Sequence, residues 1–243
     1  MTDGHGVVVP GRHAGWSVGA SWQRRMLLAS LCLALVLGYS IAIRLPVSAG
    51  WENSWIENSQ ALVLLGGGLA AMCFAMAGGR KRRTSATHAF GILAALTWFL
   101  MIARELSWGA ALGTAVVVMP DGPFYSSSVL WYHDAIRPLV GLCATFALFL
   151  IVRFRLDRLV WQLVRHRNVP SAECTILLIA ALGSTYADGH LLGLPVEQVF
   201  LGHDVVFEEW MELVGYMALV LAQQHVFASL GRLPGALTGP SSR

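Results

Sequence analysis

Carboxylate side chains recur along the last apolar segment of the chain at a spacing that could support chemistry. Asp204, Glu208 and Glu212 stand at i, i+4 and i+8, so a helix would align them in a stripe about 12 Å long. Like charges at this spacing repel each other mildly. A carboxylate at or below the lipid interface costs about 3 kcal/mol unless it is protonated, paired or bound to a metal. The stripe therefore indicates a functional site, with Glu208 and Glu212 as candidate catalytic groups.

Two histidine–aspartate pairs stand at the starts of predicted membrane spans, one upstream of the stripe and one at its first residue. Imidazole and carboxylate groups together are ligands of Zn, Mn or Fe, and they also form proton relays. We therefore predict a divalent metal held by His133, Asp134, His203, Asp204 and Glu208. The alternative for a single acid at a span entrance is a helix cap, which gains about 0.3–1 kcal/mol from the helix dipole.

Basic residues that could balance these acids are scarce near them, and two stand out. Arg104 directly precedes Glu105 at the end of the apolar run Ala89–Ala103, and Arg137 follows His133 by one helical turn. We predict Glu105 as a third catalytic group and Arg104 and Arg137 as ligands of an anionic substrate group. The alternative is a structural network of ion pairs that braces the ends of three helices.

The composition identifies the kind of protein that must position these groups. Hydrophobic residues make up 56% of the chain and charged residues 13%, and the mean hydropathy is +0.59. Soluble domains carry about 25% charged residues, so the chain belongs to the membrane class. Its 243 residues have room for about six spans of roughly 20 residues each.

The predicted fold is an all-α, polytopic transmembrane helix bundle of six spans. Apolar runs place the spans at 26–43, 56–77, 88–105, 129–152, 172–186 and 205–230. Residues 153–167 alternate basic and apolar side chains, as an interfacial helix does. The two ends of the chain, 1–25 and 231–243, are predicted to be tails outside the membrane, and residues 1–25 are polar.

The charges segregate almost completely under this topology. Fourteen of the seventeen Lys and Arg residues lie on the side of the two tails, and the exceptions are Arg44, Arg104 and Arg137. The positive-inside rule makes that side, and hence both termini, cytoplasmic. Eleven of the fourteen Asp and Glu residues lie at the outer face, and the exceptions are Asp3, Asp157 and Glu173.

Two short motifs resemble those of a known group of proteins. The sequence R-E-L-S-W-G at 104–109 resembles the E-[IL]-S-W-G signature of certain uncharacterised bacterial multi-pass inner-membrane proteins. The sequence F-E-E-W-M-E at 207–212 is similar to the F-E-E-x-x-E start of a late span in the same proteins. The resemblance covers about a dozen residues and implies a multi-pass protein of the bacterial inner membrane, without a known activity.

The inventory of possible ligands is also similar to that of the alkaline ceramidase and progestin-receptor-like membrane hydrolases. Those proteins have seven spans and a zinc site of three histidines with Asp and Ser. The corresponding residue types here are His133, His203, Asp134, Asp204 and Ser59. The H-x-x-x-H pair of their last span is absent, and Asp204 and Glu208 stand in the last span here.

Three functions agree with this sequence. The first is a metal-dependent, membrane-embedded enzyme whose outward-facing carboxylate and histidine site acts on a lipid-type substrate. The second is a proton- or ion-coupled transporter with Glu105 and Glu212 as its protonatable groups. The third is a non-catalytic subunit of a membrane complex. The expected partners are the lipid bilayer and either a second copy or a membrane-complex subunit, and not nucleic acid.

Overall fold

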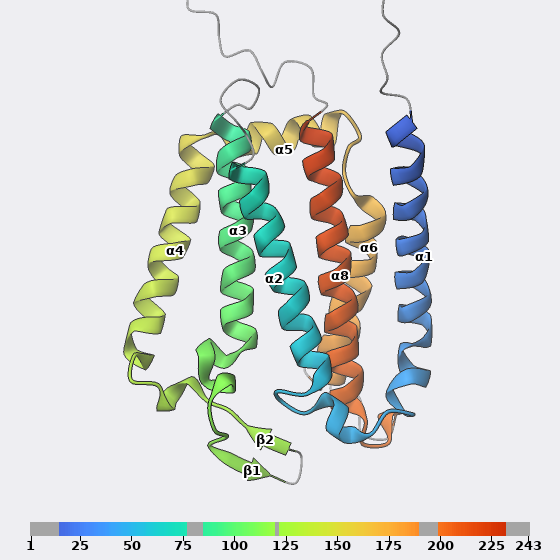
Figure 1. The fold of residues 1–243 in the computed structure, drawn as a ribbon, viewed down its shortest axis with the longest axis vertical. Helices are drawn as coiled ribbons and strands as arrows, with labels where there is room; N and C mark the ends of the chain where they lie inside the picture. The colour runs from blue at the N-terminus through green and yellow to red at the C-terminus, as the bar shows by residue number, and fades with distance from the viewer. Residues whose placement is uncertain (1–14, 77–84, 120–121, 190–198, 232–243) are drawn as a thin grey trace, which may run out of the picture.

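The computed structural model describes residues 15–76, 85–119, 122–189 and 199–231, most of which are helical (Figure 1). The α-helices are α1 (Gly15–Ala42), α2 (Trp55–Met76), α3 (Ser85–Glu105), α4 (His133–Arg153), α5 (Leu156–Arg165), α6 (Ser171–Ala187) and α8 (Asp204–Leu230). The 3-10 turns are η1 (Val47–Gly50), η2 (Ser107–Leu112) and η3 (Ser127–Val129). A small antiparallel hairpin joins β1 (Val117–Met119) to β2 (Gly122–Phe124). The predicted all-α class is confirmed.

Four of the described helices are long and apolar enough to cross a membrane: α1 from Trp22 onward, α2 with the residues before it from Val47, α3, and α4. Helix α6 is apolar but shorter, at 17 residues. Large apolar side chains cover the outside of these helices, and Val36, Leu62 and Leu142 are 78%, 69% and 67% exposed. Water-soluble proteins rarely expose large contiguous apolar surfaces. These helices therefore support the membrane class that the composition predicts.

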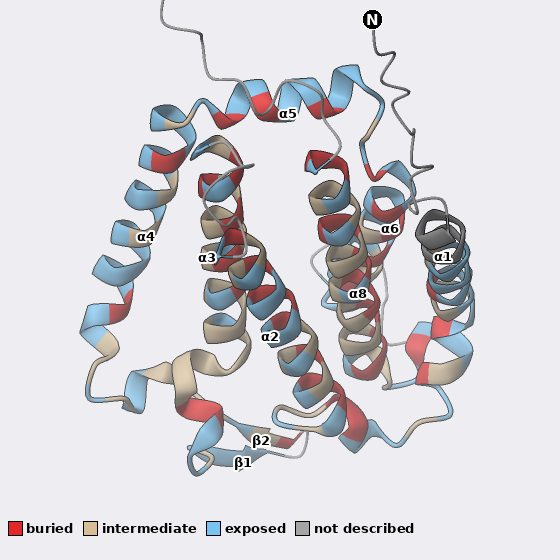
Figure 2. Cartoon of the chain, turned by 45° about the horizontal axis from the view of Figure 1, so that its top comes forward, coloured by how far each residue is buried: buried red, intermediate tan, exposed pale blue. Residues whose placement is uncertain are grey.

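Helices α1, α2, α3, α4, α6 and α8 run roughly side by side, and successive ones point in opposite directions (Figure 1). Helix α8 lies between its neighbours and contacts α1, α2 and α6, while α2 also packs along α3. Buried residues gather where these helices meet, whereas most of α4 is exposed (Figure 2). Helix α4 packs mainly against α3 and α5. The core of the bundle is therefore built around α8.

The two ends of the bundle differ in character. Helix α5 lies across the end at which α1 begins and α8 ends, and the hairpin lies at the opposite end (Figure 1). In α5, Leu156, Leu159 and Leu163 are buried while Arg158 and Arg165 are exposed. This helix falls within the basic segment that the sequence predicts to be interfacial.

Small residues let α2, α3 and α8 approach closely. A Cβ atom built on Gly67 of α2 would lie 2.7 Å from the indole of Trp98 in α3. The Trp98 Nε1–H group donates to Gln223 Oε1 of α8 at 2.5 Å, and Gln223 Nε2 donates to the Gly67 carbonyl at 3.0 Å. Close packing around glycine and a buried polar bridge are typical of helix contacts in membranes. This bridge fixes the three helices that carry the site below.

Candidate acidic site

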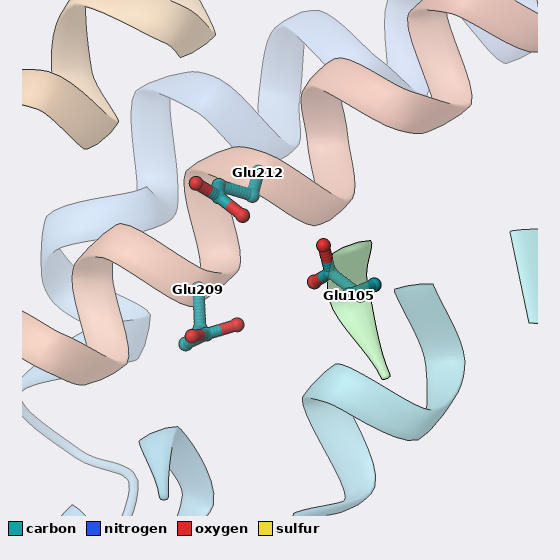
Figure 3. Close-up of side chains that lie close together, drawn as sticks. All are labelled: Glu105, Glu209 and Glu212. Carbon is teal, nitrogen blue, oxygen red and sulfur yellow. The ribbon is translucent and has the colours of Figure 1, made fainter. Parts of the chain in front are cut away.

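Three glutamates from two helices meet inside the bundle. Glu105 is the last residue of α3, and Glu209 and Glu212 lie one turn apart near the start of α8. One carboxylate oxygen from each residue lies within 4.8 Å of the other two. Figure 3 shows the carboxyl group from α3 facing the two from α8. Within the described part of the chain, this is the one group of three or more acidic, histidine or cysteine side chains arranged closely enough to hold a metal ion.

Two hydroxyl groups bind this cluster, which is defined as Glu105, Glu209 and Glu212 and is called the acid cluster below. Tyr216, one turn after Glu212, places its hydroxyl 3.2 Å from Glu105 Oε2 and 3.3 Å from Glu212 Oε2. The single phenolic proton can be donated to one of these oxygens at a time. Ser184 of α6 donates to Glu212 Oε1 at 3.2 Å. The hydroxyls therefore tie α3, α6 and α8 together at this level.

The amide of Gln60 in α2 contacts the acid cluster, and the cluster together with Gln60 is called the polar layer below. The nitrogen of this amide is hydrogen-bonded, whereas its oxygen is not. Gln60 is fully buried, and its Nε2 donates to the Glu209 backbone carbonyl at 2.7 Å and to Glu209 Oε2 at 2.8 Å. Its Oε1 is buried without a hydrogen-bond partner among the described residues. An unsatisfied buried acceptor costs about 1–3 kcal/mol. This oxygen is therefore available to a donor or a cation beside the acid cluster.

No member of the acid cluster forms an ion pair with a basic side chain of the described residues. Ion pairs within 4.0 Å join Arg24 to Glu173 and Arg155 to Asp157, and none includes a member of the cluster. Two unit charges 4.8 Å apart repel by about 3 kcal/mol at an effective dielectric constant of about 20. Three adjacent carboxylates therefore require added positive charge, from a proton or from a bound cation.

The site lies where two irregular segments meet the helices. Helix α3 ends at Glu105, and the next residues turn sharply, with φ angles of 46° at Ser107, 59° at Trp108 and 97° at Gly109. The hydroxyl of Tyr132 donates to the Trp108 carbonyl at 2.6 Å and secures this turn. The E-L-S-W-G motif therefore marks the point at which α3 stops and its final carboxylate meets α8.

Two further acids at the same end have structural contacts. Glu57, in the first turn of α2, accepts the backbone N–H of Asn53, and Glu52 accepts that of Tyr125 at 2.6 Å. Carboxylates in these positions satisfy free N–H groups near a helix start and a loop. The helix-cap interpretation therefore describes Glu57.

The structure brings together some of the residues that the sequence indicates and separates others. Glu105 and Glu212 meet, whereas Glu208 and Asp204 belong to no metal-sized group in the described residues. His203 immediately precedes α8, and its Nδ1 lies 3.3 Å from the Leu201 carbonyl. Each i+4 step on an α-helix rotates by about 40°, so Asp204, Glu208 and Glu212 point in different directions. The three predicted ligands at the start of α8, His203, Asp204 and Glu208, therefore form no group close enough to hold a metal ion.

The residues predicted on α4 lie apart from the acid cluster. His133 Nδ1 lies 3.1 Å from the Ser127 carbonyl, and Asp134 and Arg137 are exposed. Helix α4 is separated from α8 by α3 (Figures 1 and 2). Arg104 is exposed and adjoins Glu105 in the chain. Among the predicted substrate-binding residues, Arg104 is therefore the one next to the acid cluster.

Two members of the polar layer did not figure among the predicted site residues. Glu209 stands within the F-E-E-W-M-E motif, and its spacing of three from Glu212 also places both on one helix face. Gln60 stands in the apolar run of α2, where an uncharged polar residue is a weaker signal than a charge. A polar residue in a span usually faces protein, and this signal could have indicated Gln60.

An apolar cavity adjoins the polar layer. It has a volume of about 390 Å³ and lies between α1, α2 and α8. Its lining includes Val63, one turn after Gln60 in α2, and Met217, the residue after Tyr216 in α8. No member of the acid cluster lines the cavity, and the two share α8, in which Met217 follows Glu212 by five residues.

No protein-family model, curated protein or solved structure matches the chain. The geometry of the acid cluster and the composition of the chain are thus the basis for the function proposed next.

Proposed function

We propose that this chain is a six-span protein of the bacterial inner membrane with both termini in the cytoplasm. In this proposal, the acid cluster holds a divalent cation at the reaction centre of a membrane-embedded enzyme that acts on a lipid-type substrate. The observation that carries the proposal is the meeting of three carboxylates within 4.8 Å, none of them in an ion pair within 4.0 Å among the described residues. Helix α8, which carries two of them, also lines an apolar cavity.

The donor atoms favour a hard cation. The acid cluster, the free oxygen of Gln60 and the hydroxyls of Tyr216 and Ser184 offer oxygen atoms and no nitrogen or sulfur. Mg²⁺, Mn²⁺ and Ca²⁺ prefer such ligands, whereas Zn²⁺ favours histidine and cysteine. A bound cation would activate water or polarise a substrate oxygen. The exposed guanidinium of Arg104 would bind an anionic substrate group beside Glu105.

The alternation of the helices supports six spans. Helices α1, α2, α3, α4, α6 and α8 run in alternate directions, and the basic helix α5 lies at the end where α1 begins and α8 ends (Figure 1). Basic residues at that end favour a cytoplasmic location for it. Helix α6, with 17 residues, is about 26 Å long, slightly less than the hydrocarbon thickness of about 30 Å. A small local thinning of the bilayer accommodates such a difference.

A proton-coupled transporter is the second candidate function, and the contacts of Tyr216 favour it. Its hydroxyl lies within hydrogen-bonding distance of Glu105 in α3 and Glu212 in α8. A proton shared by these groups would supply the positive charge that the cluster needs, and intramembrane carboxylates form such relays in pumps and transporters.

Metal analysis of the purified protein tests the proposal. We expect about one Mg²⁺, Mn²⁺ or Ca²⁺ per chain in the unaltered protein and its loss in Glu209→Gln. Asp157→Asn is the matched control, because Asp157 is exposed and pairs with Arg155 in the turn at the start of α5. The variant Glu208→Gln separates the acid cluster from the stripe predicted by sequence, and we expect it to keep its metal.

Two outcomes would count against the enzyme proposal. An unaltered protein that contains no divalent metal and binds none on titration contradicts a metal centre. In that case, substrate-dependent proton flux in proteoliposomes, lost in Glu105→Gln, would favour the transporter. Loss of metal in Glu208→Gln with retention in Glu209→Gln would favour the stripe as the site.

A further inference from the structure

The cavity between α1, α2 and α8 is lined almost wholly by apolar atoms of helix residues. Its wall includes Leu31 of α1, Val63, Gly66 and Ala70 of α2, and Val220 and Leu221 of α8. None of its lining residues is charged, and Ser30 and Gln224 are its polar ones. The hydroxyl of Ser30 donates to the Met26 carbonyl in its own helix. The wall therefore selects an apolar occupant.

Gly66 leaves the cavity unobstructed on the side of α2. A Cβ atom built on Gly66 would have no other atom within 4 Å, whereas one on the adjacent Gly67 would collide with Trp98. The two glycines thus have different environments: Gly67 admits the indole of α3, and Gly66 exposes bare helix backbone to the cavity. Small residues on a helix in this way form a groove in which an apolar chain can lie close to the backbone.

The place of the cavity decides what fills it. Helices α1 and α2 are long and apolar enough to cross a membrane, and the cavity lies midway along them. Water does not occupy apolar cavities, which instead bind apolar molecules. Gly66, Ala70 and Met217 on its wall are exposed, so the space opens to the outside of the bundle. Its volume of about 390 Å³ falls within the range of small-molecule pockets.

We propose that this cavity binds one hydrocarbon chain of a membrane lipid and directs the polar end of that lipid toward the acid cluster. In this proposal, the hydrocarbon chain lies along Gly66 and Ala70 and passes Val63 and Met217. The end of the hydrocarbon chain that is joined to the polar group then reaches the level of Gln60 and Tyr216. The role of the cluster in this inference rests on the proposed function, and it names the substrate class as a lipid with at least one extended apolar chain.

Photolabelling of the full chain in phosphatidylglycerol bilayers tests the inference. The probe is phosphatidylglycerol with a diazirine in the middle of one acyl chain, and labelled residues are mapped by mass spectrometry. We expect labels concentrated on the segments that line the cavity, 63–70 of α2 and 217–224 of α8. In Gly66→Leu, and in Ala70→Leu as an independent second variant, labelling there should fall about tenfold, which corresponds to displacement of about two CH₂ groups.

Gly141→Leu is the matched control. Gly141 lies in α4, and a Cβ atom there also has no other atom within 4 Å, so the same change fills open space away from the cavity. This control should keep the cavity labels. Labels spread evenly over α4 and the other outer faces, or cavity labels unchanged in both α2 variants, would overturn the inference.

Metal content measured on the same samples separates this inference from the proposed function. Cavity labelling that depends on Gly66 in a protein without metal would support the chain site and contradict the metal centre. Bound metal together with even labelling would support the metal centre and contradict the hydrocarbon-chain site. Gly66→Leu with normal metal content and weak cavity labelling is the result expected if both are correct.

Discussion

Replacing Glu209 with Gln should stabilise the metal-free protein and destabilise the metal-bound one. The isosteric side chain keeps an oxygen that accepts from Gln60 Nε2, so the change removes charge while the contact at 2.8 Å can persist. It also removes the repulsion of Glu209 with Glu105 and with Glu212, each within 4.8 Å. The sign of the effect on stability therefore depends on whether a cation is present.

The magnitude follows from two limits. Two pairs of charges at 4.8 Å repel by about 7 kcal/mol in total at an effective dielectric constant of about 20. The cluster can instead take up a proton, which costs an ordinary glutamate about 4 kcal/mol at pH 7. The smaller value, that of proton uptake, limits the effect. We therefore expect Glu209→Gln to raise the free energy of unfolding of the metal-free protein by about 2–4 kcal/mol. A cation at 100 times its Kd stabilises the unaltered protein by about 2.7 kcal/mol, and the variant loses this.

Thermal unfolding in detergent, followed by the fluorescence of the nine tryptophans, measures the effect. With a chelator at pH 7, the Tm of Glu209→Gln should exceed that of the unaltered protein by about 5–10 °C. With excess Mn²⁺, the difference should shrink or reverse. Near pH 4, the metal-free difference should vanish, because the carboxylates of the unaltered protein then bind protons and the repulsion is gone.

The control is Asp157→Asn, which keeps the acid cluster, so the difference between its Tm and that of the unaltered protein should be the same with chelator and with metal. A lower Tm for Glu209→Gln in the presence of chelator would refute the reasoning, because it would mean that the charge of Glu209 stabilises the cluster. A Tm difference that is equal with and without metal would refute the cation site.

Three other predictions concern contacts between the helices. Tyr216→Phe removes the hydroxyl shared by two carboxylates, so it should cost about 1–2 kcal/mol of unfolding free energy, measured as a lower Tm, and weaken Mn²⁺ binding in a titration. Gly67→Ala should cost about 1–3 kcal/mol because its Cβ collides with the indole of α3, whereas Gly66→Ala should be nearly neutral; equal Tm values would contradict the packing. Arg24→Met should lower the free energy of unfolding by about 1–3 kcal/mol, because it leaves the fully buried Glu173 unpaired; the partial exposure of Arg24 keeps this value small. In a double-mutant cycle, Glu173→Gln should recover part of this loss, and additive losses would contradict the pair.

The helical architecture could be predicted from the sequence because long apolar runs have few alternatives. In a bilayer, each backbone N–H and C=O group must be satisfied within the protein, and a 20-residue apolar run does so as a helix. The end of α3 at Glu105 and the end of α8 at Leu230 agree with the predicted spans. The start of α1 at Gly15 could not be predicted, because that polar segment lacks the apolar pattern used to define spans.

The site was less accessible to prediction, because it depends on which helices are neighbours. Glu105 and Glu212 were indicated by their depth in apolar runs, and that signal is local. The choice between Glu208 and Glu209 depends on the rotation of α8 about its axis, since adjacent residues point about 100° apart. Gln60 contacts Glu209 across 149 positions of sequence, and no local pattern contains such a contact.

The rotation of α8 is itself set by residues of the F-E-E-W-M-E motif. Trp210 Nε1 donates to the Ala34 carbonyl of α1 at 3.1 Å, and Met211 is buried against Gly38 of α1 and Gly183 of α6. With these side chains fixed toward α1 and α6, Glu209 is turned toward Gln60 of α2, and Glu212 lies between Glu105 of α3 and Ser184 of α6. The E-L-S-W-G turn stops α3 where its last carboxylate meets them. The two motifs therefore serve one purpose, because one orients a pair of carboxylates and the other delivers the third.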